Sequence, residues 1–221
     1  TNNQYNKMLV NLSLKHSLIT NWVSELRDVN VQNDRMRFRR NLERIGEVMA
    51  YEISKELEWN KVETQTPLGI HNSKKLAAQP VLATILRAGL PLHNGMMNYF
   101  DKADHAFISA YRKHHADGTF EISLEYMSCP SLENRTVIIS DPMLATGGSL
   151  VATVDMLKRN GCKEIIAIVM VAAPEGVKLM NEKHPDVQIV AASLDSHLNE
   201  QGYIIPGLGD AGDKIFGTIH K

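Results

Sequence analysis

The sequence predicts an α/β fold in which a central, mostly parallel sheet is flanked by helices. Short apolar runs alternate with helical patterns from residue 81 onward, as in parallel strands joined by crossover helices. Three of these runs are followed directly by polar residues, at the strand ends where such sheets bind ligands: Arg87, Asp141 and Asp195. The 221 residues are 43% hydrophobic and 22% charged, which suits a single domain, residues 1–221, with its own core.

The N-terminal segment, about residues 8–60, is predicted to be helical. Its apolar residues recur every three or four positions and form one stripe on a helix: Phe38, Leu42, Ile45, Met49, Ile53 and Leu57. Asp34 is placed to cap this helix at its start. The same helix carries an arginine-rich stretch, residues 35–44, which taken alone indicates nucleic-acid binding. Glutamates interleave with the arginines, which favours a solvated or subunit-facing surface instead.

The core, about residues 80–195, holds the alternating elements. We expect them, in order, at Val81–Leu86, Leu90–Tyr99, Ala106–Tyr111, Thr136–Ser140, Ser149–Asn160, Glu164–Val171, Pro174–Lys183 and Val187–Ala192. Residues 120–126 alternate apolar with polar side chains, and Asp117-Gly118 before them is a turn signal. We therefore also expect a β-hairpin arm with a flexible loop.

The last segment, Tyr203–Lys221, is rich in Gly and Pro and has no helical or strand period. Long segments without secondary structure in a compact domain are often functional, so this one is a candidate binding segment.

Composition excludes several classes of protein. Lys+Arg number 24 and Asp+Glu 25, so no net positive field is available to hold nucleic acid or an anionic membrane. The longest apolar run, Ile165–Ala173, is far shorter than the ~20 residues of a membrane-spanning helix. The polar start, Thr1–Lys7, lacks the layout of a signal peptide. Cys129 and Cys162 form no C-x-x-C pair, and we expect a reduced, cytoplasmic location.

The most informative segment runs from Val137 to Ser149. A buried strand delivers the acid Asp141, and a short turn then leads to Thr-Gly-Gly-Ser at the start of a helix. Backbone N–H groups at a helix N-terminus bind anions, and the hydroxyl groups of Thr146 and Ser149 add two donors. An acid that accepts from sugar hydroxyls beside a phosphate site predicts a phosphorylated ribose. The alternative is a Gly-rich turn in which Ser149 caps the helix. Neither a P-loop nor a dinucleotide-binding motif is present.

Residues 141–149 resemble the phosphoribosyl pyrophosphate (PRPP) motif of the type I phosphoribosyltransferases. Most members carry two adjacent acids there, and Pro142 replaces the second acid in this chain. The Asp-Pro-Met-Leu-Ala-Thr-Gly-Gly-Ser version resembles the uracil phosphoribosyltransferase family. Further segments agree with that family, and the resemblance covers about the whole chain: Lys15-His16, Leu26-Arg27-Asp28, Ile85–Leu90, Ala172–Gly176 and Gly202–Asp213.

The resemblance implies a type I phosphoribosyltransferase fold with a C-terminal base-binding hood, about residues 196–221. It implies a pyrimidine salvage enzyme that transfers the 5-phosphoribosyl group of PRPP to N1 of uracil and gives UMP and diphosphate. Mg²⁺ is implied as cofactor, held by PRPP and water and also by Asp210, with no direct protein cage.

The resemblance also implies the site residues. It assigns uracil to Ile204, Gly209, Asp210 and Ala211, and catalytic roles to Asp210 and Arg112. It assigns PRPP to Arg87, Ala88, Gly89, Arg112, Asp141, Pro142, Met143, Leu144, Ala145, Thr146, Gly147, Gly148, Ser149 and Asp210. Arg112 would open a loop, Arg112–Gly118, that closes over the site. Family members carry a non-proline cis peptide in the Arg-Ala-Gly stretch.

Two alternatives stay open at this point. One is a pyrimidine-operon attenuation regulator that binds RNA on the same fold, against which the balanced charge argues. The other is a transferase for a different base, which the hood motif opposes. The oligomeric state of family members further implies a homodimer or homotetramer, and some members respond to GTP as an effector. His114 and His115 in the loop are interpreted as solvated residues.

Overall fold

The computed structural model describes residues 8–114 and 120–218, apart from the side chains of residues 111–125. One sheet organises the chain, in the strand order β1-β10-β9-β7-β4-β5-β6, with β8 added beside β9. Every pairing in this sheet is parallel except that of β5 with β6. The strands are β1 Leu9–Asn11, β4 Val81–Leu86, β5 Asp104–His114, β6 Phe120–Ser128, β7 Thr136–Ser140, β8 Met143–Leu144, β9 Glu164–Ala172 and β10 Gln188–Leu194. The predicted mostly parallel α/β sheet is confirmed.

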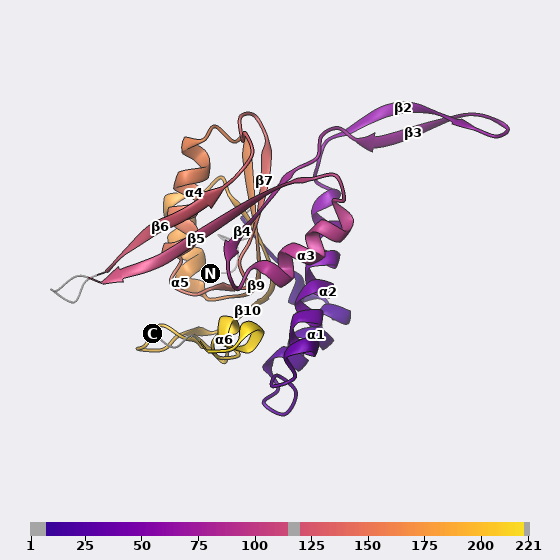
Figure 1. Cartoon of the computed structure of the whole chain (residues 1–221). Helices are drawn as coiled ribbons and strands as arrows, with labels where there is room; N and C mark the ends of the chain where they lie inside the picture. Colours follow the sequence, from indigo (N-terminus) through magenta and orange to yellow (C-terminus); the bar gives the residue numbers. More distant parts are fainter. Residues whose placement is uncertain (1–7, 115–119, 219–221) are drawn as a thin grey trace.

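Helices cover both faces of the sheet (Figure 1). One face packs against α1 Leu18–Arg27, α2 Arg35–Ser54 and α3 Leu90–Tyr99, and the other against α4 Gly148–Arg159 and α5 Pro174–Lys183. Successive residues of a strand point to opposite faces, so in β4 Leu82 joins the first core while Val81 and Ala83 join the second. The helices at Leu90–Tyr99 and Pro174–Lys183 begin and end where the sequence predicts.

The N-terminal segment is less uniformly helical than the sequence predicts. Asp34 caps α2 as expected, since its side chain accepts from the Arg37 amide at 3.0 Å. The helix ends at Ser54, however, so Leu57 lies beyond it. The expected helical stretch of residues 8–60 also contains strand β1, a 3-10 turn at Leu12–Leu14 and the first residues of strand β2 Trp59–Thr66.

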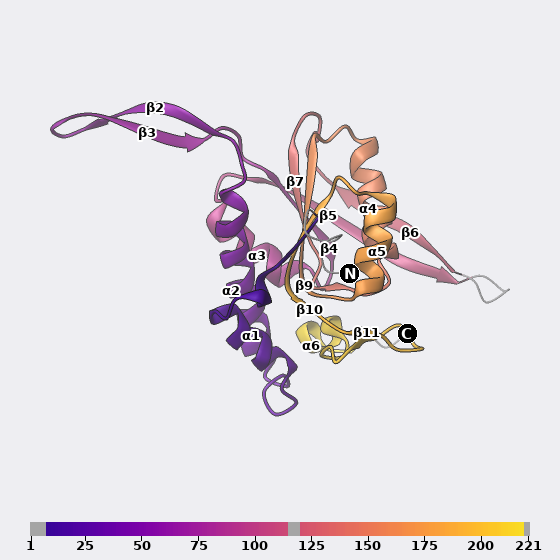
Figure 2. The same cartoon turned by 180° about the vertical axis from the view of Figure 1, so that it is seen from behind.

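A second hairpin extends away from the body of the molecule (Figure 2). It consists of β2 Trp59–Thr66 and β3 Gly69–Leu76, which pair only with each other among the described residues. The sequence does not predict this hairpin. Its side chains are mostly exposed on both faces, so the apolar alternation that normally marks a strand is absent.

The predicted hairpin arm is present as β5 and β6, but its loop starts later than expected. Arg112, Lys113 and His114 belong to β5, where Arg112 lies opposite Ile122 of β6. The expected loop Arg112–Gly118 is therefore wrong at its start, because strand pairing continues to His114. His115 and the remainder of the loop up to residue 119 lie outside the described residues.

The C-terminal segment contains more structure than its sequence indicates. After β10 it forms a small ladder of β11 His197–Leu198 with β12 Ile204–Ile205, and then the helix α6 Ala211–Phe216. The expectation that residues 203–221 lack secondary structure is thus wrong for these two elements. Within the described ranges, no helix is both long enough and apolar enough to cross a membrane.

Candidate active site

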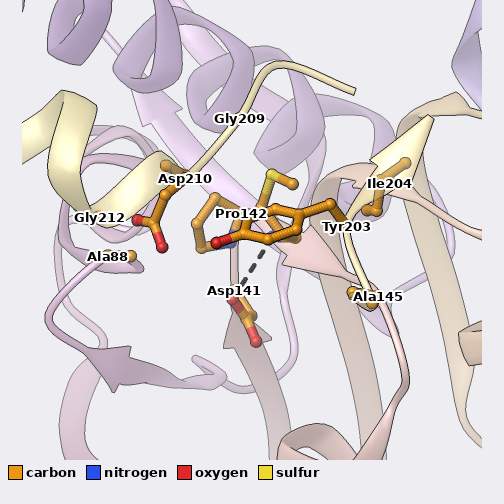
Figure 3. Close-up of a pocket in the computed structure, with 12 residues that line it drawn as sticks. Ala88, Asp141, Pro142, Ala145, Tyr203, Ile204, Gly209, Asp210 and Gly212 are labelled. Atoms are coloured by element: carbon orange, nitrogen blue, oxygen red, sulfur yellow. Dashed lines mark hydrogen bonds between the residues drawn. The ribbon is translucent and has the colours of Figure 1, made fainter. Parts of the chain in front are cut away.

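A cavity of about 280 Å³ lies between the carboxyl ends of the strands and the C-terminal segment (Figure 3). The strand ends contribute Ala88 after β4 and Asp141 after β7. The cavity is lined by Ala88, Asp141, Pro142, Met143, Ala145, Gly202, Tyr203, Ile204, Gly209, Asp210, Ala211 and Gly212. It therefore joins residues that lie more than a hundred positions apart in the chain.

The segment after β7 presents a helix N-terminus beside this cavity. Gly147 is the N-cap of α4 with a φ of +90°, a conformation that favours glycine, and no side chain caps this helix. The first turn of a helix has free N–H groups, so α4 can bind an anion here. Ser149 lies inside the first turn of α4, so the alternative of a serine-capped turn is not what the structure shows.

The segment Ala172–Gly176 supports this loop from behind. The Ala173 amide donates to the Leu144 carbonyl at 2.8 Å, and the Met170 amide donates to the Pro142 carbonyl at 2.9 Å. A Cβ on Gly176 would overlap the Ala145 carbonyl oxygen and lie 3.0 Å from the Leu144 side chain. The glycine is needed for this close approach, which explains the Ala-Ala-Pro-Glu-Gly string by packing.

Asp141 follows the buried strand β7, and the residue lines the cavity and is partly buried. Its side chain accepts only a long hydrogen bond, 3.4 Å, from the Met143 amide. Although the residue is not fully covered, burial of its carboxyl group raises the pKa of Asp141 to about 7. A carboxyl group in this state accepts or donates hydrogen bonds near neutral pH.

Arg87 follows β4 and reaches across to the C-terminal segment. The peptide bond between Leu86 and Arg87 is cis, as the resemblance implies. Arg87 Nη2 donates to the Gly217 carbonyl at 2.8 Å and lies 3.6 Å from a carboxylate oxygen of Asp213. The guanidinium carbon lies 5.7 Å from the centre of the Phe216 ring. Arg87 therefore connects the strand end to α6.

The predicted uracil residues surround the other side of the cavity. Ile204 and Ala211 are buried, and Gly209 has a φ of +89° with open space where a Cβ would be. Asp210 is the N-cap of α6 and accepts from the Asp213 amide at 2.9 Å. Figure 3 shows the Tyr203 hydroxyl directed to the side of the cavity where Asp141 and Asp210 lie.

Several predicted site residues do not line the cavity, and several residues that line it are not among those predicted. Thr146, Gly147, Gly148 and Ser149 follow Ala145 at the start of α4, but none of them lines the cavity, and the side chain of Arg112 lies outside the described part. Asp195, at the third strand end, forms an ion pair with Arg27 instead of lining the cavity. Sequence reasoning missed Gly202, Tyr203 and Gly212 as lining residues, although they fall inside the Gly202–Asp213 motif.

Carboxylate oxygens are the protein groups in the cavity that suit a hard cation, and they come from Asp141 and Asp210. Over the described ranges, no three His, Cys, Asp or Glu side chains come together as a metal site. These two carboxylates are oxygen donors of the kind that Mg²⁺ prefers.

Comparison with known proteins gives consistent results. The family model described as uracil phosphoribosyltransferase matches residues 13–218. Proteins named uracil phosphoribosyltransferase include one from Porphyromonas gingivalis, 46% identical over 95% of this chain and 98% of its own length. Another, from Ligilactobacillus salivarius, is 45% identical over 93% of this chain and 97% of its own.

A solved structure of the AQ2163 protein from Aquifex aeolicus superposes with a TM-score of 0.85 at 32% identity, covering 95% of this chain and 98% of that one. The similarity thus extends over both sides of the cavity, the strand ends as well as the C-terminal segment. The chain belongs to the uracil phosphoribosyltransferase family.

Proposed function

We propose that this protein transfers the 5-phosphoribosyl group of PRPP to N1 of uracil and releases UMP and diphosphate. One observation carries the proposal: a single cavity joins Asp141 and Ala145 of the PRPP motif to Ile204, Asp210 and Ala211 of the hood. Sugar and base must meet at reacting distance, and this juxtaposition supplies that geometry. The structure describes the hood as far as residue 218.

The PRPP side has three parts in this proposal. The first turn of α4 holds the 5-phosphate through its free N–H groups, with the hydroxyl groups of Thr146 and Ser149 nearby. Asp141 holds the ribose hydroxyls. Arg87 and Arg112 bind the diphosphate oxygens, since guanidinium groups pair with phosphate in a forked geometry.

The hood supplies the base side. Uracil presents carbonyl acceptors and N–H donors in one plane, which backbone groups at residue 204 and residues 209–211 can match. We assign Asp210 the role of accepting the N1 proton, because its carboxylate lines the cavity. The N1–C1′ bond then forms while the C1′–oxygen bond to diphosphate breaks.

Magnesium belongs to the same proposal. When bound to the diphosphate it neutralises the charge of the leaving group. Asp210, with Asp141, would hold its water ligands. The protein groups keep the two substrates aligned and exclude competing water.

Assembly, regulation and location also remain proposals. We infer a homodimer or homotetramer, supported by the β2–β3 hairpin. An isolated two-stranded hairpin is marginally stable in water, and this one leaves Leu68 fully exposed and Ile70 mostly so. Light scattering on the purified protein measures the assembly. The proposal that GTP is an effector rests on the family resemblance. The proposal of a cytoplasmic location rests on that resemblance and on the two unpaired cysteines.

The test is nucleotide formation from PRPP and Mg²⁺ with uracil, cytosine, orotate, hypoxanthine and adenine in parallel, with and without GTP. We expect UMP from uracil alone. Turnover of another base would contradict the assignment of the hood but not of the PRPP side. The relatives reported above are named as an enzyme, which gives no support to an RNA-binding regulator. Filter binding of RNA with and without UMP tests that alternative directly.

A further inference from the structure

Asp195 is an acid at the carboxyl end of β10, where ligand-binding side chains usually lie, yet it does not line the cavity. We propose that Arg27 and Asp195 are positioning residues for uracil, which fix the hood against the sheet without touching the base. The inference rests on the proposed function, because it takes the hood to be the uracil site.

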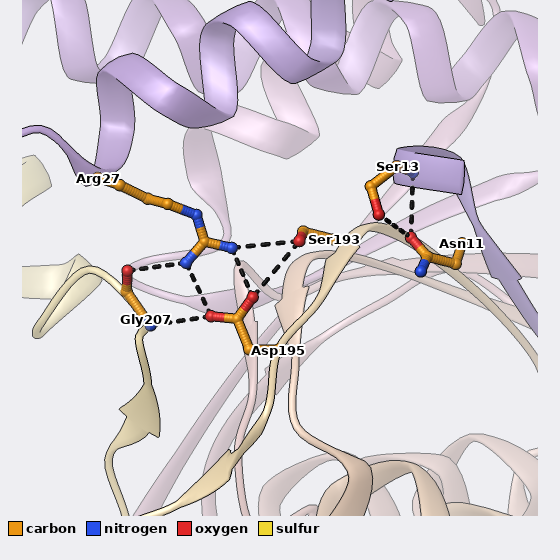
Figure 4. Close-up of polar contacts among 6 residues, drawn as sticks. All are labelled: Asn11, Ser13, Arg27, Ser193, Asp195 and Gly207. Atoms are coloured by element: carbon orange, nitrogen blue, oxygen red, sulfur yellow. Dashed lines mark hydrogen bonds and ion pairs between the residues drawn. The ribbon is translucent and has the colours of Figure 1, made fainter. Parts of the chain in front are cut away.

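Arg27 and Asp195 form hydrogen bonds with each other and with neighbouring residues (Figure 4). Arg27 Nη1 donates to Asp195 Oδ2 at 2.7 Å, and Arg27 Nη2 donates to the second carboxylate oxygen and to Ser193 Oγ at 3.1 Å. Such a forked pairing fixes the orientation of both groups. It connects the end of helix α1 with the end of strand β10, 168 residues later.

The hood is attached to this pair through one residue, Gly207. Its carbonyl accepts from Arg27 Nη1 at 2.8 Å, and its amide donates to Asp195 Oδ2 at 2.8 Å. Both backbone polar groups of Gly207 are therefore held by the ion pair. Its φ of +57° and its close approach to the Ile204 carbonyl leave no room for a Cβ, so its position is coupled to that of Ile204.

Burial of the Arg27–Asp195 ion pair favours one fixed position of the hood. The Asp195 side chain is only 3% exposed and that of Arg27 22%, so removing either partner leaves a charge that water reaches poorly. After such a change the hood relaxes around the unpaired group. A misplacement of about 1 Å at a reacting group can cost about a hundredfold in rate.

Other contacts keep the hood attached when the pair is altered. Gln32 Nε2 donates to the Leu208 carbonyl at 3.2 Å, and Arg39 donates to the Ile215 carbonyl at 2.9 Å. We therefore expect the hood to shift in position while remaining folded. The phosphate loop has its own supports in β9 and α5, so PRPP binding is expected to be preserved.

The test compares Asp195→Asn and Arg27→Lys with the wild type by steady-state kinetics in both substrates. We expect KM for uracil to rise about tenfold or more, equal to ~1.4 kcal/mol, with KM for PRPP within about twofold of the wild type. Arg27→Lys keeps the charge but loses the fork, so its effect should be smaller than that of Arg27→Met. Asp104→Asn is the matched control, since it breaks an ion pair with Arg135, 2.6 Å long, at the start of β5.

Three results would overturn the inference. These are equal changes in both KM values, a lower melting temperature with both KM values unchanged, or the same KM split in Asp104→Asn. If Asp195→Asn does not fold, the Arg27→Lys and Arg27→Met pair still decides the question. A wild type that converts no uracil would instead refute the proposed function, before any variant is compared.

Discussion

The two sides of the cavity are built in different ways. The phosphate side, residues 141–149, is held by backbone hydrogen bonds from β9 and by close packing on Gly176, all within a span of 36 residues. The hood is held largely by side chains from distant parts of the chain, among them Arg27, Gln32 and Arg39 from its first quarter. A site held by backbone hydrogen bonds depends on steric fit. A site held by side chains depends on a few polar groups that a substitution can remove.

This difference predicts different responses to substitution. On the phosphate side, steric changes should alter stability and PRPP binding together, because loop and sheet are one packed unit. In the hood, changes of charge or hydrogen bonding should alter uracil binding and turnover while PRPP binding is preserved. Single substitutions on each side of the cavity test this contrast.

Asp210→Asn should cause the largest loss of activity. Asn caps a helix about as well as Asp, so the bond to the Asp213 amide and the start of α6 should survive. If the carboxylate accepts the N1 proton, its loss should lower kcat by about 10²- to 10⁴-fold. Steady-state kinetics and a thermal melt measure the two effects. Full turnover in this variant would eliminate Asp210 as the proton acceptor.

Gly176→Ala should be the most damaging small change on the phosphate side. The added methyl group would overlap the Ala145 carbonyl and press on Leu144, at a cost of about 1–3 kcal/mol. KM for PRPP should rise along with the loss of stability. Gly69→Ala is the control, because nothing lies within 4 Å of a Cβ there. Urea unfolding and kinetics would disprove the shape argument if the two variants behaved alike.

Asp141 should make stability depend on pH. Its pKa is raised from an ordinary 3.8 to about 7, so between pH 4 and 7 the unfolded chain loses this proton while the folded chain keeps it. The free energy of unfolding should therefore fall as pH rises through this window, by at most about 1.4 kcal/mol per pH unit from this group. The fall ends above pH 7, where both states are ionised.

Asp141→Asn lacks this ionisation. The difference in urea midpoint between wild type and variant should therefore shift in favour of the variant from pH 4 to pH 7. A constant difference across that range would show that the Asp141 carboxyl group has an ordinary pKa.

Glu175→Gln should have the smallest effect. Glu175 at the start of α5 accepts from the Leu198 amide of the hood at 3.0 Å, and this bond lowers the pKa of its carboxyl group. The neutral amide oxygen still accepts from Leu198, so we expect a stability loss of no more than about 1 kcal/mol. Thermal melts measure it. A large loss would mean that the two sides of the cavity are more strongly coupled than their separate supports indicate.

The sequence predicts the sheet well because its signals are local. Strands at Val81–Leu86 and Thr136–Ser140 are short, mostly apolar runs, and the structure has the same bounds. The phosphate side is predictable for the same reason, since strand, acid and glycines are contiguous. The β2–β3 hairpin has no buried face, so its alternation is invisible in the sequence.

Two features of the hood cannot be predicted from local sequence patterns. Helix α6 is only six residues long and depends on the Asp210 cap, too short for a helical period to register. The Arg27–Asp195 pair spans 168 residues, and each member looks like an ordinary charged residue in its own segment. Contacts of this kind depend on the tertiary fold, and nothing in the local pattern reveals them.

The long span between Arg27 and Asp195 also has a consequence for biosynthesis. A nascent chain that has reached residue 176 already contains the phosphate loop and the glycine that supports it. Arg27 has by then been made, but its partner and the hood are still to be translated. The residues of the base pocket are therefore completed only after those of the phosphate loop have been translated.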